Sequence, residues 1–234
     1  MLVAKKPAPQ IGFAMPGPFD YENGISLIKD MHKYEALYGM DIRQHICDEL
    51  RLKPSNVSFR NDAEAFIAGE VFCGAAIGYK KAIGITLGTG VGSAKSCDGI
   101  SNDLNLGSSL FKDGIAEDYI STRWFLKRYN ELTGKVVEDV KQLAKLAETD
   151  TDVQQIFKEF TKNLSSFLKK FIDDESPAIV VIGGGMVGAS ALFIDSLRKA
   201  LSKSVAQIKI SELGEDASII GAAALHSYAE TTFL

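Results

Sequence analysis

Cysteine is scarce in this sequence of 234 residues, and its three copies lie far apart. Cys47, Cys73 and Cys97 form no CxxC pair. This spacing argues against a disulfide framework and against a structural zinc site, because both need cysteines grouped in recognisable sets. A reducing, cytoplasmic setting is therefore expected.

The sequence also lacks a net positive charge. The net charge is −4 at pH 7 and no lysine- or arginine-rich block occurs, so the sequence offers no basic surface for a nucleic-acid backbone. Residues 1–10 lack the apolar run of a signal peptide. Residues 178–194 are apolar, but this stretch is shorter than the roughly 20 residues that span a bilayer, and glycines interrupt it. We expect a soluble protein with no nucleic-acid partner and no membrane partner.

What the sequence does contain is typical of a globular α/β protein. Apolar residues make up 46% and charged residues 24%, which is enough to build a large core. Strand-like runs alternate with helix-like segments, so we predict sheets covered by helices. Strands are predicted at 10–15, 57–59, 178–182 and 206–210, a hairpin at 81–96, loops at 100–114, and helices at about 29–52, within 60–80, around the stripe 153–171, and at 187–201 and 216–229.

Residues 85–94, ITLGTGVGSA, carry glycines at alternate positions directly after an apolar run. Without side chains at Gly88, Gly90 and Gly92, a strand–turn–strand leaves one face bare and its amides free to bind an anion. Thr89 adds a hydroxyl donor, and a phosphate chain would suit such a turn. The alternative is a glycine-rich hairpin or bulge that binds nothing. From these residues alone, both interpretations stay open.

A second glycine cluster, Gly183, Gly184 and Gly185, follows a buried strand and precedes a helix. Such a strand–turn–helix junction often presents a ligand site at the strand ends of an α/β sheet. The alternative is a tight turn with close helix packing. The run G-G-G-M-V-G is not GxGxxG, and no acidic residue is placed to hold a ribose. Dinucleotide binding is therefore disfavoured.

Two polar or rigid segments complete the candidate site. Asn61 and Asp62 stand at the junction of a short strand and a helix, where both residue types are favoured helix caps. The functional interpretation is that the aspartate faces a cleft and accepts a proton from a substrate hydroxyl. Pro16 and Gly17, in the segment AMPGPFD, form a rigid turn that either lines a substrate cleft or is scaffolding.

Taken in order, these motifs resemble the ROK family of sugar kinases and related repressors, whose members share the two-lobed fold of hexokinase and actin. The resemblance extends over nearly the whole chain. It is carried by IGFAMPGPFD (11–20), NDAEAFIAGE (61–70), LGTGVG (87–92), GGG (183–185) and GEDASIIGAAAL (214–225).

The resemblance implies a ribonuclease H-like α/β fold and a function. The small lobe would comprise residues 1–80 with the final helix 217–234 packed near it, and the large lobe residues 81–216. The chain would phosphorylate a hexose or amino-hexose with ATP and Mg²⁺, without zinc, as a homodimer. The metal ligands are not identified.

The same resemblance implies a role for individual residues. Asp62 would be the catalytic base. Asn61 and Glu117 would bind sugar hydroxyls, with Pro16, Gly17 and Asn105 on the substrate side of the cleft. The nucleotide would be bound by Gly88, Thr89, Gly90 and Gly92 at its phosphates, and by Gly183, Gly184 and Gly185 at its adenosine.

The sequence departs from the family pattern in three places. Family kinases open with a DxGGT phosphate loop, and nothing before residue 10 matches it, so we expect a small lobe that lacks its first strands and an impaired kinase. Residues 103–114 replace the family's GEHGH-like segment and cysteine cluster, with Asn105 and Ser108 standing where Glu and His are usual. The family's repressors carry an N-terminal helix-turn-helix for which these 234 residues leave no room, so we expect no DNA binding. The alternatives are a non-catalytic regulatory protein that binds sugar or nucleotide, and a fragment whose true start lies upstream.

Overall fold

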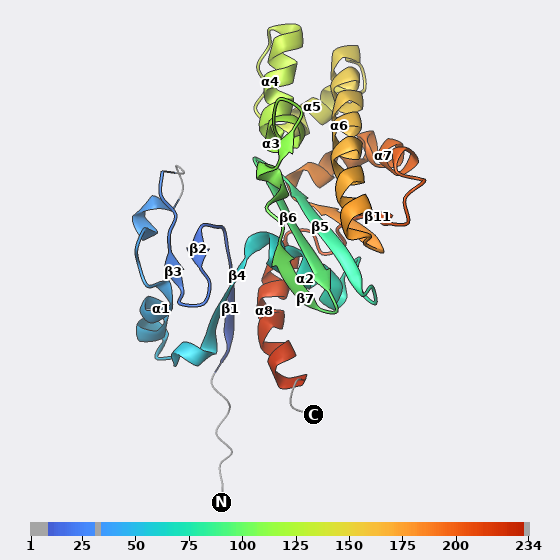
Figure 1. Ribbon diagram of the computed structural model, residues 1–234. Helices are drawn as coiled ribbons and strands as arrows, with labels where there is room; N and C mark the ends of the chain where they lie inside the picture. The colour runs from blue at the N-terminus through green and yellow to red at the C-terminus, as the bar shows by residue number, and fades with distance from the viewer. Residues whose placement is uncertain (1–8, 31–33, 232–234) are drawn as a thin grey trace, which may run out of the picture.

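A five-stranded sheet, the largest sheet among the described residues, forms the centre of the molecule (Figure 1). The computed structural model describes residues 9–30 and 34–231. Within them, β5, β10 and β11 run parallel, while β6 and β7 are added antiparallel at the other edge. The strand order is β11 (Gln207–Ile210), β10 (Ile179–Gly183), β5 (Lys81–Leu87), β6 (Val91–Cys97) and β7 (Ile100–Asp103). The chain thus has the mixed α/β architecture that the sequence predicts.

The smaller part of the molecule is built on two parallel strands. β1 (Ile11–Met15) pairs with β4 (Val57–Asn61), and a short hairpin of β2 (Phe19–Asp20) and β3 (Ile25–Ser26) lies beside them. Phe19, Cys47, Val57 and Phe59 form its core. The helix predicted for 29–52 is wrong in extent: among the described residues an α-helix, α1, covers only Ile42–Leu50. It starts there because the Asp41 side chain accepts the amide of Gln44 as an N-cap.

A pair of small-residue helices lies between the β1–β4 pair and the five-stranded sheet. α2 (Asp62–Cys73) packs against α8 (Asp216–Thr231), against β1 and against the face of the five-stranded sheet (Figure 1). A Cβ atom at Gly69 would lie 2.0 Å from the carbonyl oxygen of Ala217, and one at Gly221 would lie 1.8 Å from that of Ala65. The two helix backbones therefore approach so closely that only glycine fits at these positions.

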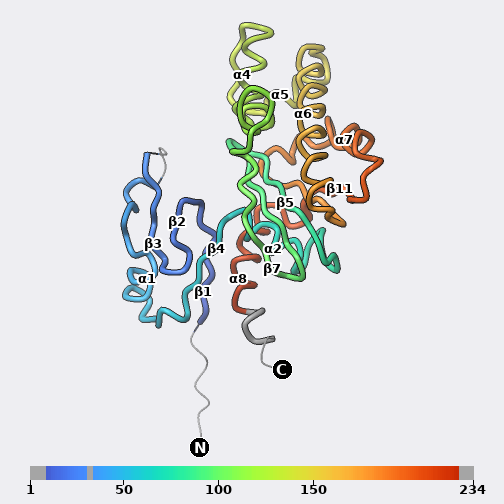
Figure 2. The backbone as a smooth tube through the Cα atoms, viewed as in Figure 1, coloured from blue at the N-terminus to red at the C-terminus, as the bar shows by residue number. Residues whose placement is uncertain are grey.

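The helices that follow β9 and precede β11 gather at one end of the five-stranded sheet (Figure 2). The buried stripe of α6 includes Phe160, Phe167 and Leu168 and forms the centre of the main core, as predicted from its periodicity. The helices are α3 (Glu117–Ile120), α4 (Thr122–Thr133), α5 (Val140–Leu146), α6 (Thr151–Glu175) and α7 (Ile194–Ala200).

Two predictions in this part of the chain are wrong. Residues 100–114 contain β7, a 3-10 turn (Leu106–Ser108) and the hairpin of β8 (Leu110–Phe111) and β9 (Gly114–Ile115). Strands of two residues leave no readable alternation in a sequence. The helix predicted for 187–201 is divided into a 3-10 segment, Gly185–Leu192, and α7.

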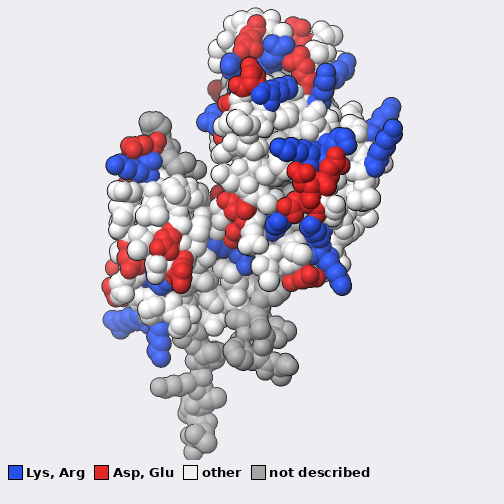
Figure 3. Space-filling view, viewed as in Figure 1, with Lys and Arg blue, Asp and Glu red and all other residues white. Residues whose placement is uncertain are grey.

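The surface carries both signs of charge. Figure 3 shows acidic and basic side chains interspersed over the helical part, with an indentation between this part and the one that bears α1. Among the residues that the structure describes, no helix combines the length and the apolar character needed to cross a bilayer.

Candidate functional site

Most of the predicted site residues line a single cleft of about 680 Å³. The cleft lies where the turn between β5 and β6 approaches the start of α2 and the rigid turn after β1. The predicted residues at its wall are Pro16, Gly17, Asn61, Asp62, Gly88, Thr89, Gly90, Gly92, Asn105, Glu117 and Gly184. Segments far apart in the sequence therefore meet at one place, as a binding site requires.

The glycine turn has fewer free amides than the sequence suggests. The amide of Gly88 donates to the carbonyl oxygen of Gly90 at 3.0 Å, and the amide of Val91 donates to Glu117 Oε1 at 2.9 Å. Gly92 lies in the ladder opposite Thr86. Within the described chain, the amides of Thr89 and Gly90 are the ones left without a partner, so an anion would be bound at the tip of the turn.

The three glycines of this turn are needed for different reasons. A Cβ at Gly90 would lie 2.7 Å from Glu117 Oε1, and one at Gly92 would lie 2.4 Å from Thr86 Oγ1. Both are packing constraints within the protein. A Cβ at Gly88 would meet no described atom closer than 4.0 Å, so only at Gly88 does the bare backbone face open space in the cleft.

Asn61 is the N-cap of α2, which is the structural alternative that the sequence left open. Its Oδ1 accepts the amides of Ala63 at 2.8 Å and Glu64 at 3.2 Å, and its side chain is buried. Asp62 follows as the first residue of the helix, is exposed, and lines the cleft. Asn61 is the N-cap of α2, and Asp62 Oδ1 also accepts the amide of Ala63, at 2.9 Å, while the residue lines the cleft.

Tyr21 contacts the candidate site through Asn61, which the sequence analysis did not foresee. Its hydroxyl accepts from Asn61 Nδ2 at 3.2 Å and donates to the carbonyl oxygen of Met15 at 3.1 Å. Burial raises the pKa of Tyr21 to about 12, although the hydrogen bond from Asn61 opposes this rise. The tyrosine therefore stays protonated, and its hydroxyl fixes the amide group of Asn61. No sequence pattern marks this residue, because the contact spans 40 positions.

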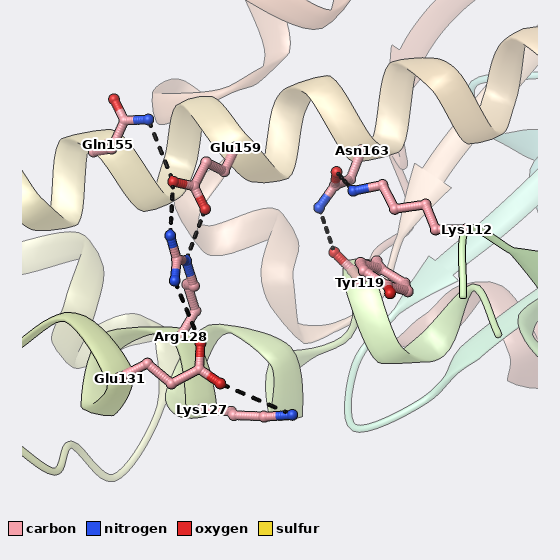
Figure 4. A network of polar contacts seen from close by, with 8 residues as sticks. All are labelled: Lys112, Tyr119, Lys127, Arg128, Glu131, Gln155, Glu159 and Asn163. Carbon is pink, nitrogen blue, oxygen red and sulfur yellow. Dashed lines mark hydrogen bonds and ion pairs between the residues drawn. The ribbon is translucent and has the colours of Figure 1, made fainter. Parts of the chain in front are cut away.

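Glu117 is held in place from both sides. While its Oε1 takes the amide of Val91, its Oε2 pairs with Arg123 Nη2 at 2.8 Å. Asn163 of α6 fixes the same short helix, because Asn163 Nδ2 donates to the carbonyl oxygen of Tyr119 at 3.3 Å. Lys112 Nζ donates to Asn163 Oδ1 at 2.7 Å and lies over the Tyr119 ring (Figure 4). The carboxylate at the cleft wall is therefore well positioned.

A larger groove of about 1040 Å³ adjoins this cleft, and Glu117 lines both. Its charged side chains mostly pair with one another: Arg128 bonds Glu159 at 2.8 and 3.2 Å and also approaches Glu131 (Figure 4). The hydrogen bond from Arg128 lowers the pKa of Glu159. The charged side chains in this groove thus serve to hold α4 against α6.

The charged residues of the cleft are all acidic. Among the residues that the structure describes, its walls carry Asp62, Asp103 and Glu117 but no lysine, arginine or histidine. Asp103, which the sequence analysis missed, accepts the amide of Asn105 at 2.8 Å through Oδ1 and donates its own amide to Glu64 Oε1 at 2.7 Å. The negative charge of a bound anion would therefore have to be balanced by a cation that binds together with it.

The second glycine cluster reaches the cleft only in part. Gly184 lines it with a φ of +87°, and a Cβ there would lie 2.5 Å from the carbonyl oxygen of Leu87. Gly183 is buried instead, because a Cβ would lie 2.4 Å from the ring of Phe66. Gly185 is exposed, away from the cleft wall. The three glycines therefore do not share one role.

Comparison with known proteins identifies relatives of the chain and solved structures that share its fold. The glucokinase of Thermotoga maritima is 26% identical over 255 residues, covering 93% of this chain and 79% of that protein. An N-acetyl-D-glucosamine kinase of Photobacterium profundum is 26% identical over 248 residues, covering 92% and 80%. A ROK family glucokinase from Streptomyces griseus, solved in complex with glucose and AMPPNP, superposes with a TM-score of 0.76 at 20% identity over 94% of this chain and 82% of that one. The family model of the ROK family matches residues 3–102 and 112–228, and the chain belongs to the ROK family.

Proposed function

We propose that this protein phosphorylates a hydroxyl group of a hexose or amino-hexose with ATP. The observation that carries the proposal is that Asp62 and the tip of the glycine turn line the same cleft. Phosphoryl transfer requires mainly positioning, neutralisation of charge and one base. The related glucokinase and N-acetyl-D-glucosamine kinase support a sugar as the acceptor.

The cleft suits a phosphate chain at one point and a sugar at another. The amides of Thr89 and Gly90, with the open face of Gly88, would hold phosphate oxygens. Gly184 would lie against the nucleoside. ATP supplies the phosphoryl group, and Mg²⁺ neutralises the phosphate charge. The described residues contain no group of three or more His, Cys, Asp or Glu side chains that could hold a metal ion by themselves. Mg²⁺ usually binds through substrate phosphates, one or two carboxylates and water, so it would enter with the nucleotide and use at most one or two of the carboxylates of the cleft, Asp62, Asp103 and Glu117.

The remaining steps belong to the side chains of this protein. Asp62 accepts the proton of the reacting sugar hydroxyl as its oxygen attacks. Glu117 and Asn105 bind other hydroxyls from the far wall of the cleft, and Asn61 offers the one amide hydrogen that Tyr21 does not hold. Pro16 and Gly17 close the sugar side. The cleft would thus lie between lobes 1–80 and 81–216.

The test is ADP release with a panel of hexoses and N-acetylated amino-hexoses. General-base help is typically worth ~10²–10⁴-fold in rate, so Asp62→Asn should lower the rate by about that factor. Asp174→Asn is the matched control, because Asp174 is exposed on α6 away from the cleft. If neither ATP nor any sugar of the panel raises Tm and no ADP is released, the proposal is wrong. A sugar that raises Tm without ADP release would indicate the binding-only regulatory alternative.

A further inference from the structure

Glu70, near the end of α2, carries a fully buried carboxylate with four hydrogen-bond donors around it. Its Oε2 accepts the amides of Ala75 at 2.7 Å and Glu212 at 3.4 Å. Its Oε1 accepts the amide of Leu213 at 3.2 Å and the hydroxyl of Ser211. Both oxygens are therefore saturated, which is how a buried carboxylate is tolerated without a cation.

These donors come from two different connections of the chain. Ala75 belongs to residues 74–80, which lead from α2 to β5, and the other donors belong to residues 211–215, which lead from β11 to α8. Both connections join the five-stranded sheet to the α2–α8 pair. Two further contacts link the first connection to β11, the strand that precedes the second: Tyr79 Oη donates to Gln207 Oε1 at 2.9 Å, and Lys209 Nζ donates to the carbonyl oxygen of Ala75 at 3.3 Å.

The surrounding backbone is shaped to this carboxylate. A Cβ at Gly74 would lie 2.4 Å from Glu70 Oε2, so the position next to the helix end has no room for a side chain. The Glu70 carbonyl oxygen also accepts the amides of Gly74 and Ala76 at 3.1 and 3.0 Å. One residue therefore closes the helix through its main chain and ties both connections through its side chain.

The other end of the same helix carries the proposed base. Eight residues separate Glu70 from Asp62, which is about 12 Å along a helix that rises about 1.5 Å per residue. The start of α8 contacts this end too, because Ser218 Oγ donates to the carbonyl oxygen of Asp62 at 3.3 Å. A shift of α2 relative to the two connections would hence move Asp62 relative to the glycine turn of the sheet.

We propose that Glu70 is a positioning residue: it fixes α2 to both connections and so sets the distance between Asp62 and the glycine turn. This inference rests on the proposed kinase function. A misplacement of about 1 Å can cost about 10²-fold in rate, so loss of the anchor should be visible in kcat. Glu70 is not among the residues that line the cleft, so it would touch neither the sugar nor the nucleotide in the proposed site.

The experiment compares three variants at a temperature where each is fully folded. Glu70→Gln places an amide N–H against backbone N–H donors, and we expect kcat to fall about 10- to 100-fold. Ser211→Ala removes one of the four donors to Glu70, so kcat should fall by a smaller factor. If Glu70→Gln does not fold, the kcat of Ser211→Ala tests the inference instead. Glu215→Gln makes the same chemical change at an exposed site in the same connection and should leave kcat and KM unchanged.

Amide hydrogen exchange separates positioning from simple anchoring. In Glu70→Gln, the amides of Ala75 and Leu213 should exchange faster in either case, but a positioning role also requires faster exchange at Ala63 and Glu64, beside Asp62. Wild-type kcat and KM in Glu70→Gln would overturn the inference. If the wild-type protein releases no ADP with any sugar, the proposed function fails, but the inference can still be tested by exchange in Glu70→Gln. Faster amide exchange at Ala63 and Glu64 in this variant than in wild type supports the inference, and unchanged exchange overturns it.

Discussion

Asn61 is held between its own helix and Tyr21: its Oδ1 caps α2, and its Nδ2 donates to the Tyr21 hydroxyl at 3.2 Å. The amide group can therefore present only one hydrogen to the cleft, in an orientation that the tyrosine fixes. A residue that the sequence analysis assigned to substrate binding is also part of the framework that orients the proposed base.

Replacing Tyr21 with phenylalanine tests this orientation with little change in shape. A hydrogen bond is worth about 1 kcal/mol, so the KM for sugar should rise about fivefold while the KM for ATP stays unchanged. Loss of the bond to Met15 should lower Tm by about 2–4 °C. Tyr34→Phe, at an exposed position, is the control. An unchanged sugar KM in Tyr21→Phe would mean that the orientation of Asn61 does not matter for binding.

Gly183 and Gly185 make a matched pair for the second glycine cluster. Gly183→Ala would push a methyl group into the ring of Phe66, and overpacking of this kind costs about 1–3 kcal/mol, or about 2–4 °C in Tm for each kcal/mol. Gly185→Ala meets no described atom within 4 Å and has no positive φ, so Tm should not change. Differential scanning fluorimetry measures both.

The same pair reports on the nucleotide. If the turn lies against the adenosine at Gly185, the KM for ATP should rise in Gly185→Ala although the protein is as stable as wild type. An unchanged KM would restrict nucleotide contact to Gly184, the member of the cluster that lines the cleft.

The sequence predicts those features that depend on neighbours along the chain. The stripe of α6 and the hairpin of β5 and β6 can be read from periodicity and turn residues because each is a local pattern. The resemblance of the motifs to the family predicts that Asp62, Glu117 and the glycine turn belong to one site. The role of Asn61 was left open, because Asn and Asp are both good caps and only the geometry shows which one serves.

Contacts between distant segments account for what the sequence analysis missed. Asp103 reaches the cleft because β7 pairs with β6 in a register that sets it opposite Ala94. The Val91 amide is consumed by a carboxylate 26 positions away. Local sequence patterns predict neither the register of two strands nor a hydrogen bond between distant residues. For this reason the sequence suggested more free amides in the turn than the structure has.

Removal of Mg²⁺ should abolish nucleotide binding as well as turnover. The described walls of the cleft carry three carboxylates and no basic side chain, so the charge of a phosphate chain is opposed rather than balanced unless a cation accompanies it. ATP alone should leave Tm unchanged, and ATP with Mg²⁺ should raise it. Equal shifts with and without the metal would show that a cationic group outside the described walls binds the phosphates.

Glu64 should make the protein less stable at neutral pH than a neutral side chain of the same shape would. Burial raises the pKa of Glu64 above its usual value, and the hydrogen bond from the Asp103 amide and then the attraction of Arg60 oppose this rise less strongly. A raised folded-state pKa adds stability below the unfolded value of about 4.3, and this stability is lost as the pH rises through the folded-state pKa. Glu64→Gln keeps an oxygen for the amide of Asp103, so the variant should have the higher Tm at pH 7–8.

The pH dependence of this difference is the decisive measurement. Thermal unfolding of wild type and Glu64→Gln between pH 3 and pH 8 should show the two curves converging as Glu64 becomes protonated in both states. Glu148→Gln, at an exposed position, should follow the wild type throughout. A Glu64→Gln variant that is less stable than wild type at pH 7 would mean that the hydrogen bond from the Asp103 amide and the attraction of Arg60 together outweigh the cost of burial. The carboxylate would then be a stabilising neighbour of the cleft.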